Sequence, residues 1–311
     1  PELRITVLSR KPFHHFFPDS DRLHFEAVDT KGEHKGLRGL RRLYKQLWKK
    51  YEFNAVADFH NVLRSQVITG LFNLKRIPSA AIKKGRADKK LLTLKKGKVF
   101  IPLKHSSRRY ADVLKKLGVK FKFDEHELKA HITLSEKAPL PLNTNNIGLA
   151  PFAQHKGKAL PFEKVKELVE QLSKNTSNTI FLFGGGEKEV ELLSTLEGDN
   201  VVSLAGKFSL PQELAQIAAL DVMISMDSAN MHMASLVGTK TVSVWGATHY
   251  FAGFLGIGQT IDNVVEVSHE ELPCRPCSVF GNKPCYRKDY ACLNLLTAQQ
   301  IRAKTEAVLN H

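Results

Sequence analysis

VMISMDSANMHMA, residues 222–234, places a run of mostly apolar residues directly before Asp227 and Ser228, and a helix-like stretch follows. The second half of the chain repeats this pattern. The other strand-like runs are 147–150, 179–183, 201–204 and 241–245, and the helix-like stretches are 162–172, 187–196, 210–219 and 230–237. This alternation predicts a parallel sheet covered by helices on both faces. Ligands of such sheets bind beyond the carboxyl ends of the strands, so the residues after each strand are the candidate site.

The first half alternates less regularly. Strands are predicted at 4–9 and 54–59, and helices at 64–74 and 110–117; residues 32–39 and the lysine-rich stretch 83–98 are predicted to be loops. A linker rich in Pro and Asn at 139–146 predicts two domains, 1–145 and 146–311. A doubly wound domain normally opens with its central strand, and the first domain is expected to lack that strand. Residues 297–309 have helical spacing and form either a cap or a helix that returns to the first domain.

The composition is that of a soluble globular protein, with 42% hydrophobic and 25% charged residues among 311. No apolar run is long enough for a membrane span and no secretory signal is recognised, so we expect a cytoplasmic protein. The net charge of +15 is uneven. Residues 1–145 hold 32 Lys and Arg against 14 Asp and Glu, a balance of +18, whereas residues 146–311 hold 14 against 17. The first half therefore attracts polyanions, although the lysine-rich stretch is equally well explained as a solvated loop.

Asp227 and Ser228 stand where a helix is predicted to begin. Their side chains can cap its free N–H groups, and the same N–H groups, with the helix dipole, form an anion site. His232 lies within the first two turns, near any phosphate bound there. The alternative is that Asp227 is only an N-cap and His232 a packed imidazole.

The other strand ends carry residues of the same kind. A glycine-rich turn at 184–186 permits close backbone approach, and Glu187 after it offers a carboxylate for ribose hydroxyls. Lys156 and Lys158 follow the first strand and can meet a diphosphate as point charges. Leu204–Lys207 and Trp245–His249 end two further strands. Five consecutive strand ends with such residues favour a ligand site over coincidence.

Residues 227–234 followed by Trp-Gly-Ala-Thr at 245–248 resemble the signature of the lipopolysaccharide heptosyltransferase family, glycosyltransferase family 9. Residues 57–65 are similar to the family's acceptor-domain element, and the glycine-rich turn and the Ala-Gly-Lys turn at 205–207 also match. The resemblance implies a GT-B fold, in which two Rossmann-like domains face a cleft. It further implies inverting, metal-independent transfer from a donor that is usually ADP-heptose.

The resemblance also implies roles for individual residues. Asp227, Ser228 and His232 would hold the diphosphate and sugar, and Lys156 or Lys158 would neutralise phosphate charge. The remaining donor residues would be Gly185, Glu187, Gly206 and Thr248, and the acceptor residues His60, Arg64 and Ser65. Ala229 and Tyr250 depart from a glycine and a proline of the family pattern. The family's base, an aspartate in a loop after the first strand, has no counterpart here, and Asp58 is the substitute candidate. If the chain is N-terminally truncated, we expect it to be inactive.

The four cysteines are gathered between 274 and 292. The spacing of Cys274, Cys277, Cys285 and Cys292 suits a structural zinc with four thiolates. A second Cys-x-x-Cys pair would strengthen the pattern and is missing. Reduced, unliganded cysteines or adventitious disulfides are the alternatives, and the metal would staple a loop without acting in transfer.

The leading hypothesis is heptosyl transfer from a nucleotide-diphosphate sugar to the lipopolysaccharide core or a related glycan. A basic acceptor domain suits a lipid-linked anionic glycan at the inner face of the inner membrane, with peripheral membrane contact. One alternative is a non-catalytic module that binds nucleic acid or another polyanion, but no nucleic-acid-binding motif is present and no nucleic-acid partner is expected. Another is a nucleotide-sugar epimerase of GT-B architecture.

Overall fold

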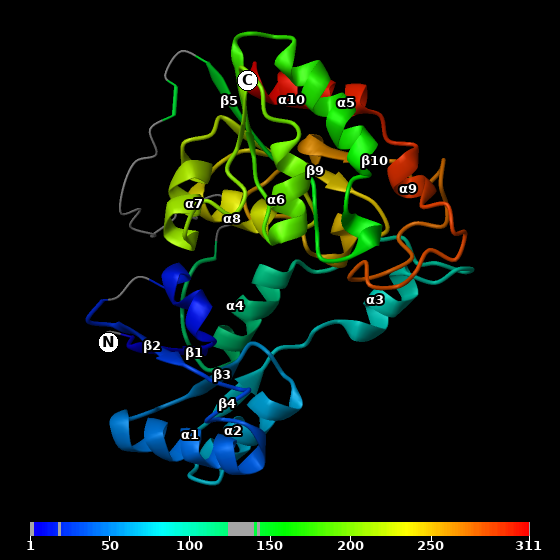
Figure 1. Cartoon of the computed structure of the whole chain (residues 1–311). Coiled ribbons are helices and arrows are strands. Elements are labelled where there is room, and N and C mark those ends of the chain that lie inside the picture. The colour runs from blue at the N-terminus through cyan, green and yellow to red at the C-terminus, as the bar shows by residue number, and fades with distance from the viewer. Residues whose placement is uncertain (1–2, 18–19, 124–139, 142–143, 311) are drawn as a thin grey trace. The chain divides into compact units, whose positions relative to one another are not determined.

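The computed structural model describes residues 3–17, 20–123, 140–141 and 144–310. These residues form two compact units (Figure 1). One unit comprises the described residues up to 84 together with 106–123, and the other comprises 85–105 and the described residues from 140 onward. Residues 85–105 thus lie in the second unit, although the predicted boundary follows residue 145. Of the predicted linker, residues 139, 142 and 143 lie outside the described residues.

The second unit is built on a parallel sheet whose described strands have the order β10-β9-β8-β5-β6-β7. The strands are β5 (Asn145–Ala150), β6 (Asn178–Leu182), β7 (Val201–Ser203), β8 (Val222–Met226), β9 (Thr241–Trp245) and β10 (Val264–Glu266). The order reverses between β5 and β8, as in doubly wound nucleotide-binding sheets. The five strands predicted from apolar runs are confirmed. The sequence analysis missed β10, which is short and lies at the edge.

Helices cover this sheet because their apolar residues recur at helical spacing and lie against the buried strands. In α5 (Phe162–Ser173), for example, Val165, Leu168, Val169 and Leu172 join the core. The other helices are α6 (Glu187–Ser194), α7 (Leu210–Ala218), α8 (Ala229–Val237), α9 (Ala291–Asn294) and α10 (Ala298–Leu309), with the short 3-10 turns η2 (Lys156–Lys158), η3 (Tyr250–Ala252) and η4 (Ile261–Asn263). All predicted helices of this half are confirmed.

The C-terminal helix α10 lies beside α5 (Figure 1) and also contacts β9 and β8. Its buried residues Ala298, Ile301, Thr305 and Val308 form the inward side. Of the two possibilities left open by the sequence, the structure therefore has the helix as a cap on the second unit.

The first unit holds two short parallel sheets. β1 (Ile5–Ser9) pairs with β2 (Leu23–Ala27), and β3 (Val56–Asp58) pairs with β4 (Ser79–Ala81). The helical segments are η1 (Lys11–Phe16), α1 (Gly36–Lys50), α2 (Leu63–Asn73) and α4 (Ser106–Lys116). Residues 32–39 were predicted to be a loop, but α1 begins at Gly36. Leu40, Leu43 and Leu47, three and four residues apart, supply the buried face that forms this helix.

From residue 85 onward the lysine-rich stretch is a docked segment of the second unit, and the prediction of a loop throughout was wrong. It contains α3 (Arg86–Leu92) and then runs on to His105. Lys98 Nζ donates hydrogen bonds to the carbonyl oxygens of Pro273, Cys274 and Pro276 at 2.9–3.2 Å, and burial lowers the pKa of Lys98. Residues 85–105 hold seven Lys and Arg against one Asp, so part of the charge counted in the first half belongs to the second unit.

None of the helices within the described ranges has the length and apolarity that crossing a bilayer demands.

Candidate functional site

The carboxyl ends of β5 and β8 lie next to each other where the strand order of the second unit reverses. The chain leaves β5 at Ala150 and reaches Lys158 after a short loop, and it leaves β8 at Met226 with Asp227 as the next residue. Because ligands of doubly wound sheets bind at this reversal, the two loops define the candidate site.

Lys158 and Asp227 meet across this site. Lys158 Nζ lies 3.0 Å from Asp227 Oδ2, and both side chains are largely shielded from water. The contact is an ion pair without hydrogen-bond geometry, since Oδ2 is a buried atom with no hydrogen-bond partner among the described residues. The structure thus joins two residues that the sequence analysis selected 69 positions apart.

Helix α8 begins at Ala229, and no side chain caps it. Ser228 is the N-cap, but no side-chain hydrogen bond caps the first turn, so the predicted capping by Asp227 and Ser228 is wrong. Asp227 Oδ2 lies against Lys158 instead. Ser228 Oγ instead lies 3.2 Å from Ser225 Oγ. The first N–H groups of α8 are therefore left for water or for a bound anion.

His232 lies one turn into α8, and its side chain is exposed to solvent although many protein atoms lie around the ring. The loss of water around the ring lowers the pKa of His232, Asp227 opposes this shift, and the charges of His105 and Lys158 add to it. The ring is therefore neutral near pH 7 and belongs to the same electrostatic cluster as the ion pair. His105 was not selected from the sequence; its Nε2 lies 2.7 Å from the carbonyl oxygen of Leu255.

Two contacts position the lysines of the turn after β5. The aliphatic stem of Lys158 runs against Gly281, where an added Cβ would lie 2.5 Å from Lys158 Cγ and Cδ. Lys156 Nζ lies 5.1 Å from the centre of the Tyr290 ring, within the range of a cation–π contact. Gly281 and Tyr290 belong to the segment between Cys274 and Cys292, which will be called the Cys loop. The Cys loop is therefore one wall of the candidate site.

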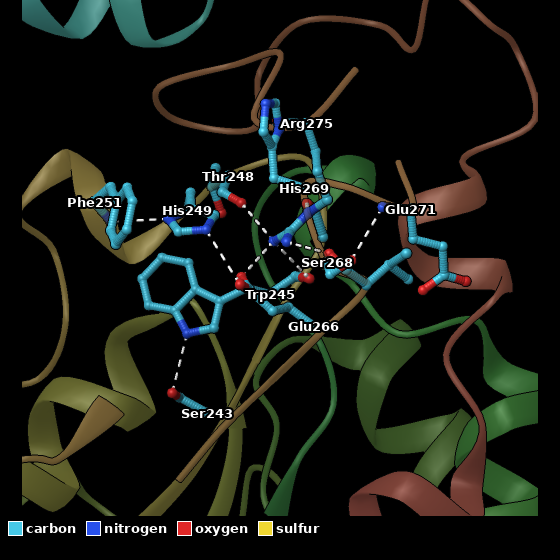
Figure 2. Close-up of polar contacts among 12 residues, drawn as sticks. Ser243, Trp245, Thr248, His249, Phe251, Glu266, Ser268, His269, Glu271 and Arg275 are labelled. Atoms are coloured by element: carbon cyan, nitrogen blue, oxygen red, sulfur yellow. Dashed lines mark hydrogen bonds and ion pairs between the residues drawn. The ribbon is translucent and has the colours of Figure 1, made fainter. Parts of the chain in front are cut away.

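The loop after β9 is held by a buried guanidinium that the sequence analysis missed (Figure 2). Arg275 is fully buried and donates to the carbonyl oxygens of Trp245, Gly246, Thr248 and Val267. Its Nη2 also lies 2.8 Å from Glu266 Oε2, and His249 Nε2 lies 3.2 Å from Glu266 Oε1. The sequence offered one hint of this role: Arg275 lies inside the Cys-x-x-Cys pair, where a turn fixes its position.

Figure 2 also shows His249 turned between Glu266 and Phe251. His249 Nδ1 accepts the N–H of Phe251 at 3.0 Å, so the neutral ring carries its proton on Nε2 and donates it to Glu266. Burial lowers the pKa of His249, and Glu266 opposes that shift. The pKa of Glu266 is itself lowered, because the hydrogen bond from His249 and the charge of Arg275 outweigh the effect of burial.

The remaining donor candidates lie at other strand ends. Glu187 is exposed at the start of α6, and the glycine-rich turn before it is fixed by Glu189, whose Oε2 accepts the Gly185 N–H at 2.8 Å. Gly206 has a φ of +68°, which favours glycine. Thr248 is fully buried, and its hydroxyl has no hydrogen-bond partner in the described part of the chain. Within the described residues, no hydrogen bond or ion pair joins Gly185, Glu187, Gly206 or Thr248 to the Lys158–Asp227 pair.

The acceptor candidates lie together after β3 in the first unit. The buried Asp58 carboxylate accepts hydrogen bonds from the backbone N–H groups of His60 and Asn61 and from the Ser65 hydroxyl, at 2.7–2.9 Å. These three bonds favour a structural role for Asp58 over the role of a base. They also occupy Ser65, while the side chains of His60 and Arg64 are exposed.

The four cysteines are free thiols in one region, and no disulfide joins them. Burial and the neighbouring Cys274 and Cys285 raise the pKa of Cys277, and burial first, then Cys277, raise the pKa of Cys292 to about 12. Within the described residues, no group of three or more His, Cys, Asp or Glu has the arrangement of a metal site. A metal would have to draw the thiols together and deprotonate them.

The chain matches a known protein family over most of its length. The model of glycosyltransferase family 9 (heptosyltransferase) matches residues 40–283. Lipooligosaccharide heptosyltransferase 2 of Campylobacter jejuni serotype O:2 is 26% identical over 203 residues, which are 63% of this chain and 60% of that protein. Lipopolysaccharide heptosyltransferase 1 of Campylobacter coli is 30% identical over 122 residues, 37% of this chain and 35% of that protein. The chain thus spans less than two-thirds of the length of these curated relatives.

Solved structures agree on the architecture. The family 9 glycosyltransferase of Veillonella parvula has a TM-score of 0.71 at 17% identity, over 99% of this chain and 88% of that one. The Escherichia coli heptosyltransferase WaaC with ADP has a TM-score of 0.67 at 17% identity, over 99% and 91%. These likenesses confirm the predicted two-domain GT-B fold.

Proposed function

Because the chain belongs to glycosyltransferase family 9, we propose that it transfers heptose from ADP-heptose to the lipopolysaccharide core or a related glycan. The transfer inverts the anomeric carbon and uses no metal. The proposal takes its nucleotide from the solved Escherichia coli relative, which carries ADP. The acceptor in this proposal is an anionic, lipid-linked glycan.

The observation that carries the proposal is the Lys158–Asp227 ion pair at the reversal of strand order. A diphosphate at this point meets the lysine ammonium and the uncapped N–H groups of α8 together. Asp227 holds the ammonium in place before the donor arrives, so little side-chain freedom is lost on binding. Lys156 adds a second cation at the open side of the turn, and His232 and Ser228 lie near the sugar. Glu187 and the backbone around Gly185 and Gly206 would hold the ribose, and Thr248 would lie beneath the phosphates.

The reaction forms a bond between an acceptor hydroxyl oxygen and the anomeric carbon, and breaks the bond from that carbon to the diphosphate. The diphosphate leaves with the electron pair, so negative charge grows on its oxygens in the transition state. Lys156, Lys158 and the α8 dipole stabilise that charge, which is the work of preorganised electrostatics. The proton of the attacking hydroxyl passes to a base, and we assign no described residue to that role.

On the acceptor side, we assign the exposed Arg64 and His60 to an acidic sugar or phosphate of the glycan. Arg64 suits such a group because its planar guanidinium matches the geometry of a carboxylate or phosphate. Ser65 contributes by holding the Asp58 turn on which His60 stands.

The Cys loop is proposed to hold a structural zinc through Cys274, Cys277, Cys285 and Cys292. The spacing and the soft thiol donors support this, and the thiols have to move closer together on binding. The metal would fix the wall that carries Gly281 and Tyr290. It takes no part in transfer.

We place the protein in the cytoplasm, in peripheral contact with the inner face of the inner membrane. The support is the positive charge of the first unit: residues 1–84 and 106–123 hold 23 Lys and Arg against nine Asp and Glu, which suits an anionic leaflet. No nucleic-acid partner is proposed.

Calorimetric titration tests the donor assignment. The chain is titrated with ADP-heptose, ADP, UDP and GDP, and selective binding of the adenine nucleotides is expected. Lys158→Met should weaken ADP binding about 10- to 100-fold, since a bond to a charged group contributes about 1.5–3 kcal/mol. Asp227→Ala should weaken it as well, by freeing the Lys158 side chain.

Lys166→Met on α5 is the matched control, because it removes one exposed lysine without touching the site. Equal ADP affinity of Lys158→Met and the control would refute the assignment. Preference for UDP over ADP would favour the epimerase hypothesis. Binding of any polyanion with a steep salt dependence, and of no nucleotide in particular, would favour the polyanion-binding module.

A further inference from the structure

The outward side of α1 carries a row of cations with no acidic neighbour on the helix. Arg38, Arg41, Arg42, Lys45 and Lys49 are all exposed, and the helix contains no Asp or Glu. Lys50, the next residue, is paired with Glu26, whereas no ion pair is recorded for these five within the described residues. They will be called the α1 cations. Five unpaired cations on fifteen residues form a strongly positive surface.

Apolar side chains line one edge of this surface. Leu37 is 71% exposed and Trp48 is 43% exposed. They are eleven positions apart, about three helical turns, so they lie on the same side of α1. The Trp48 ring packs against Tyr44 and Phe72, with centroids 6.0 and 6.2 Å apart, which leaves its outer side to solvent.

The end of α2 extends the same surface. Phe72 touches Trp48, and Leu74, two residues further on, is 81% exposed. Lys75 and Arg76 follow and are exposed as well. α1 and α2 lie side by side (Figure 1), and the exposed Leu74 follows two residues after the Phe72 that Trp48 touches.

This combination fits one kind of partner. Exposed leucines have no place against the phosphates or base faces of nucleic acid, where stacking by aromatic rings is the usual apolar contact. An anionic bilayer offers both layers that the surface needs: headgroup phosphates for the cations and an acyl boundary for leucine and tryptophan. Tryptophan is also enriched at membrane interfaces.

We propose that the outer side of α1, together with the turn after α2, docks onto an anionic lipid bilayer. The α1 cations contact the headgroups, and Leu37, Trp48 and Leu74 enter the interface. This deepens the proposed function, because it names the face that makes the membrane contact. It does not depend on the identity of the donor sugar.

The chain contains its own reporter. Of its two tryptophans, Trp245 is fully buried and Trp48 is not. The full chain is mixed with vesicles of equal parts phosphatidylglycerol and phosphatidylcholine. We expect a blue shift of the emission and quenching by brominated acyl chains, both of which Trp48→Phe should abolish while sedimentation with vesicles persists.

Affinity is tested by substitution. Arg41→Gln with Lys45→Gln should lower vesicle partitioning about 30-fold, since each basic residue near an anionic surface contributes roughly a fivefold factor. Lys188→Gln with Lys240→Gln, two exposed lysines of the second unit, removes the same charge and should leave partitioning unchanged. Circular dichroism confirms that the variants are folded.

Equal partitioning of the two double variants would overturn the proposal. So would vesicle binding without quenching of Trp48, or single-stranded RNA that binds the α1 cations while vesicles do not bind. ADP titration of the same samples separates the hypotheses. If the unmodified chain binds ADP but no vesicles, the docking face alone is rejected. If it binds vesicles but not ADP, the donor site alone is rejected.

Discussion

Replacing Arg275 with methionine tests whether a single buried guanidinium holds the loop after β9. Methionine fills much of the same volume without the charge or the donors. The change leaves four carbonyl oxygens without their donor and leaves the largely buried Glu266 carboxylate with His249 as its remaining partner.

The expected cost is about 4 kcal/mol of unfolding free energy. Removing one partner of a buried ion pair costs about 3–5 kcal/mol because the other charge stays uncompensated. The lost carbonyl bonds, each about 1 kcal/mol net, act on the same loop and are not simply additive. Adding Glu266→Gln removes the stranded charge, so the double variant should recover about 2 kcal/mol relative to Arg275→Met alone.

Urea unfolding in a Trp48→Phe background gives the measurement. Fluorescence then reports on Trp245, whose carbonyl oxygen is one of the Arg275 acceptors. A cost below about 1 kcal/mol would refute the assignment of the network to stability. A double variant no more stable than Arg275→Met would show that the stranded carboxylate is not the cause.

Three further predictions follow from the same unit. Gly281→Ala should weaken ADP binding roughly tenfold, because the new Cβ would lie 2.5 Å from two Lys158 carbons and the φ of Gly281 is +74°. Gly198→Ala is the control: no atom lies near its added Cβ, so ADP binding should be unchanged. Burial lowers the pKa of His249, so as the pH falls the imidazole is protonated in the unfolded chain before it is protonated in the folded chain. The free energy of unfolding should therefore be constant above about pH 6.5 and decrease below it. His249→Gln should flatten that decrease when urea unfolding is measured at several pH values. If the Cys loop holds zinc, elemental analysis should find it at a one-to-one ratio in the intact chain and absent from Cys274→Ser with Cys277→Ser, whereas equal content in both would reject the site.

The sequence predicted the second unit well because its strands are buried on both faces. Such strands are nearly continuous apolar runs that can be recognised without knowing their neighbours, and Val222–Met226 is one example. The topology of parallel sheets then implies where their ends meet. Lys158 and Asp227 could be selected for this reason, although their direct contact could not be foreseen. Whether they bind the donor stays a prediction.

What the sequence could not supply depends on contacts between distant segments. Arg275 acts on carbonyl oxygens 27 to 30 residues away, and backbone acceptors leave no mark in a sequence. The lysine-rich stretch was taken for a loop because its charges dominate its composition. Two contacts dock it: the Phe100 ring stacks on His269 with 4.0 Å between centroids, and Lys98 donates to backbone carbonyl oxygens such as that of Cys274. The start of α1 was predicted to be a loop because glycines stand at positions 36 and 39. The helix forms because its leucines pack in the core.

The positive charge of the first half therefore has to be divided by what each cation touches. Lys98 is used up by the carbonyls of the Cys loop, and Lys89 lies 4.0 Å from the Phe254 ring, so neither is a free surface charge. Both belong to the second unit. The α1 cations, by contrast, form no ion pair with any residue that the structure describes, and exposed leucine and tryptophan lie on the same helix. A net charge computed over residues 1–145 merges these two groups. Attraction to an anionic surface should depend on the α1 cations and be largely insensitive to Lys89 and Lys98. Composition alone cannot make this distinction.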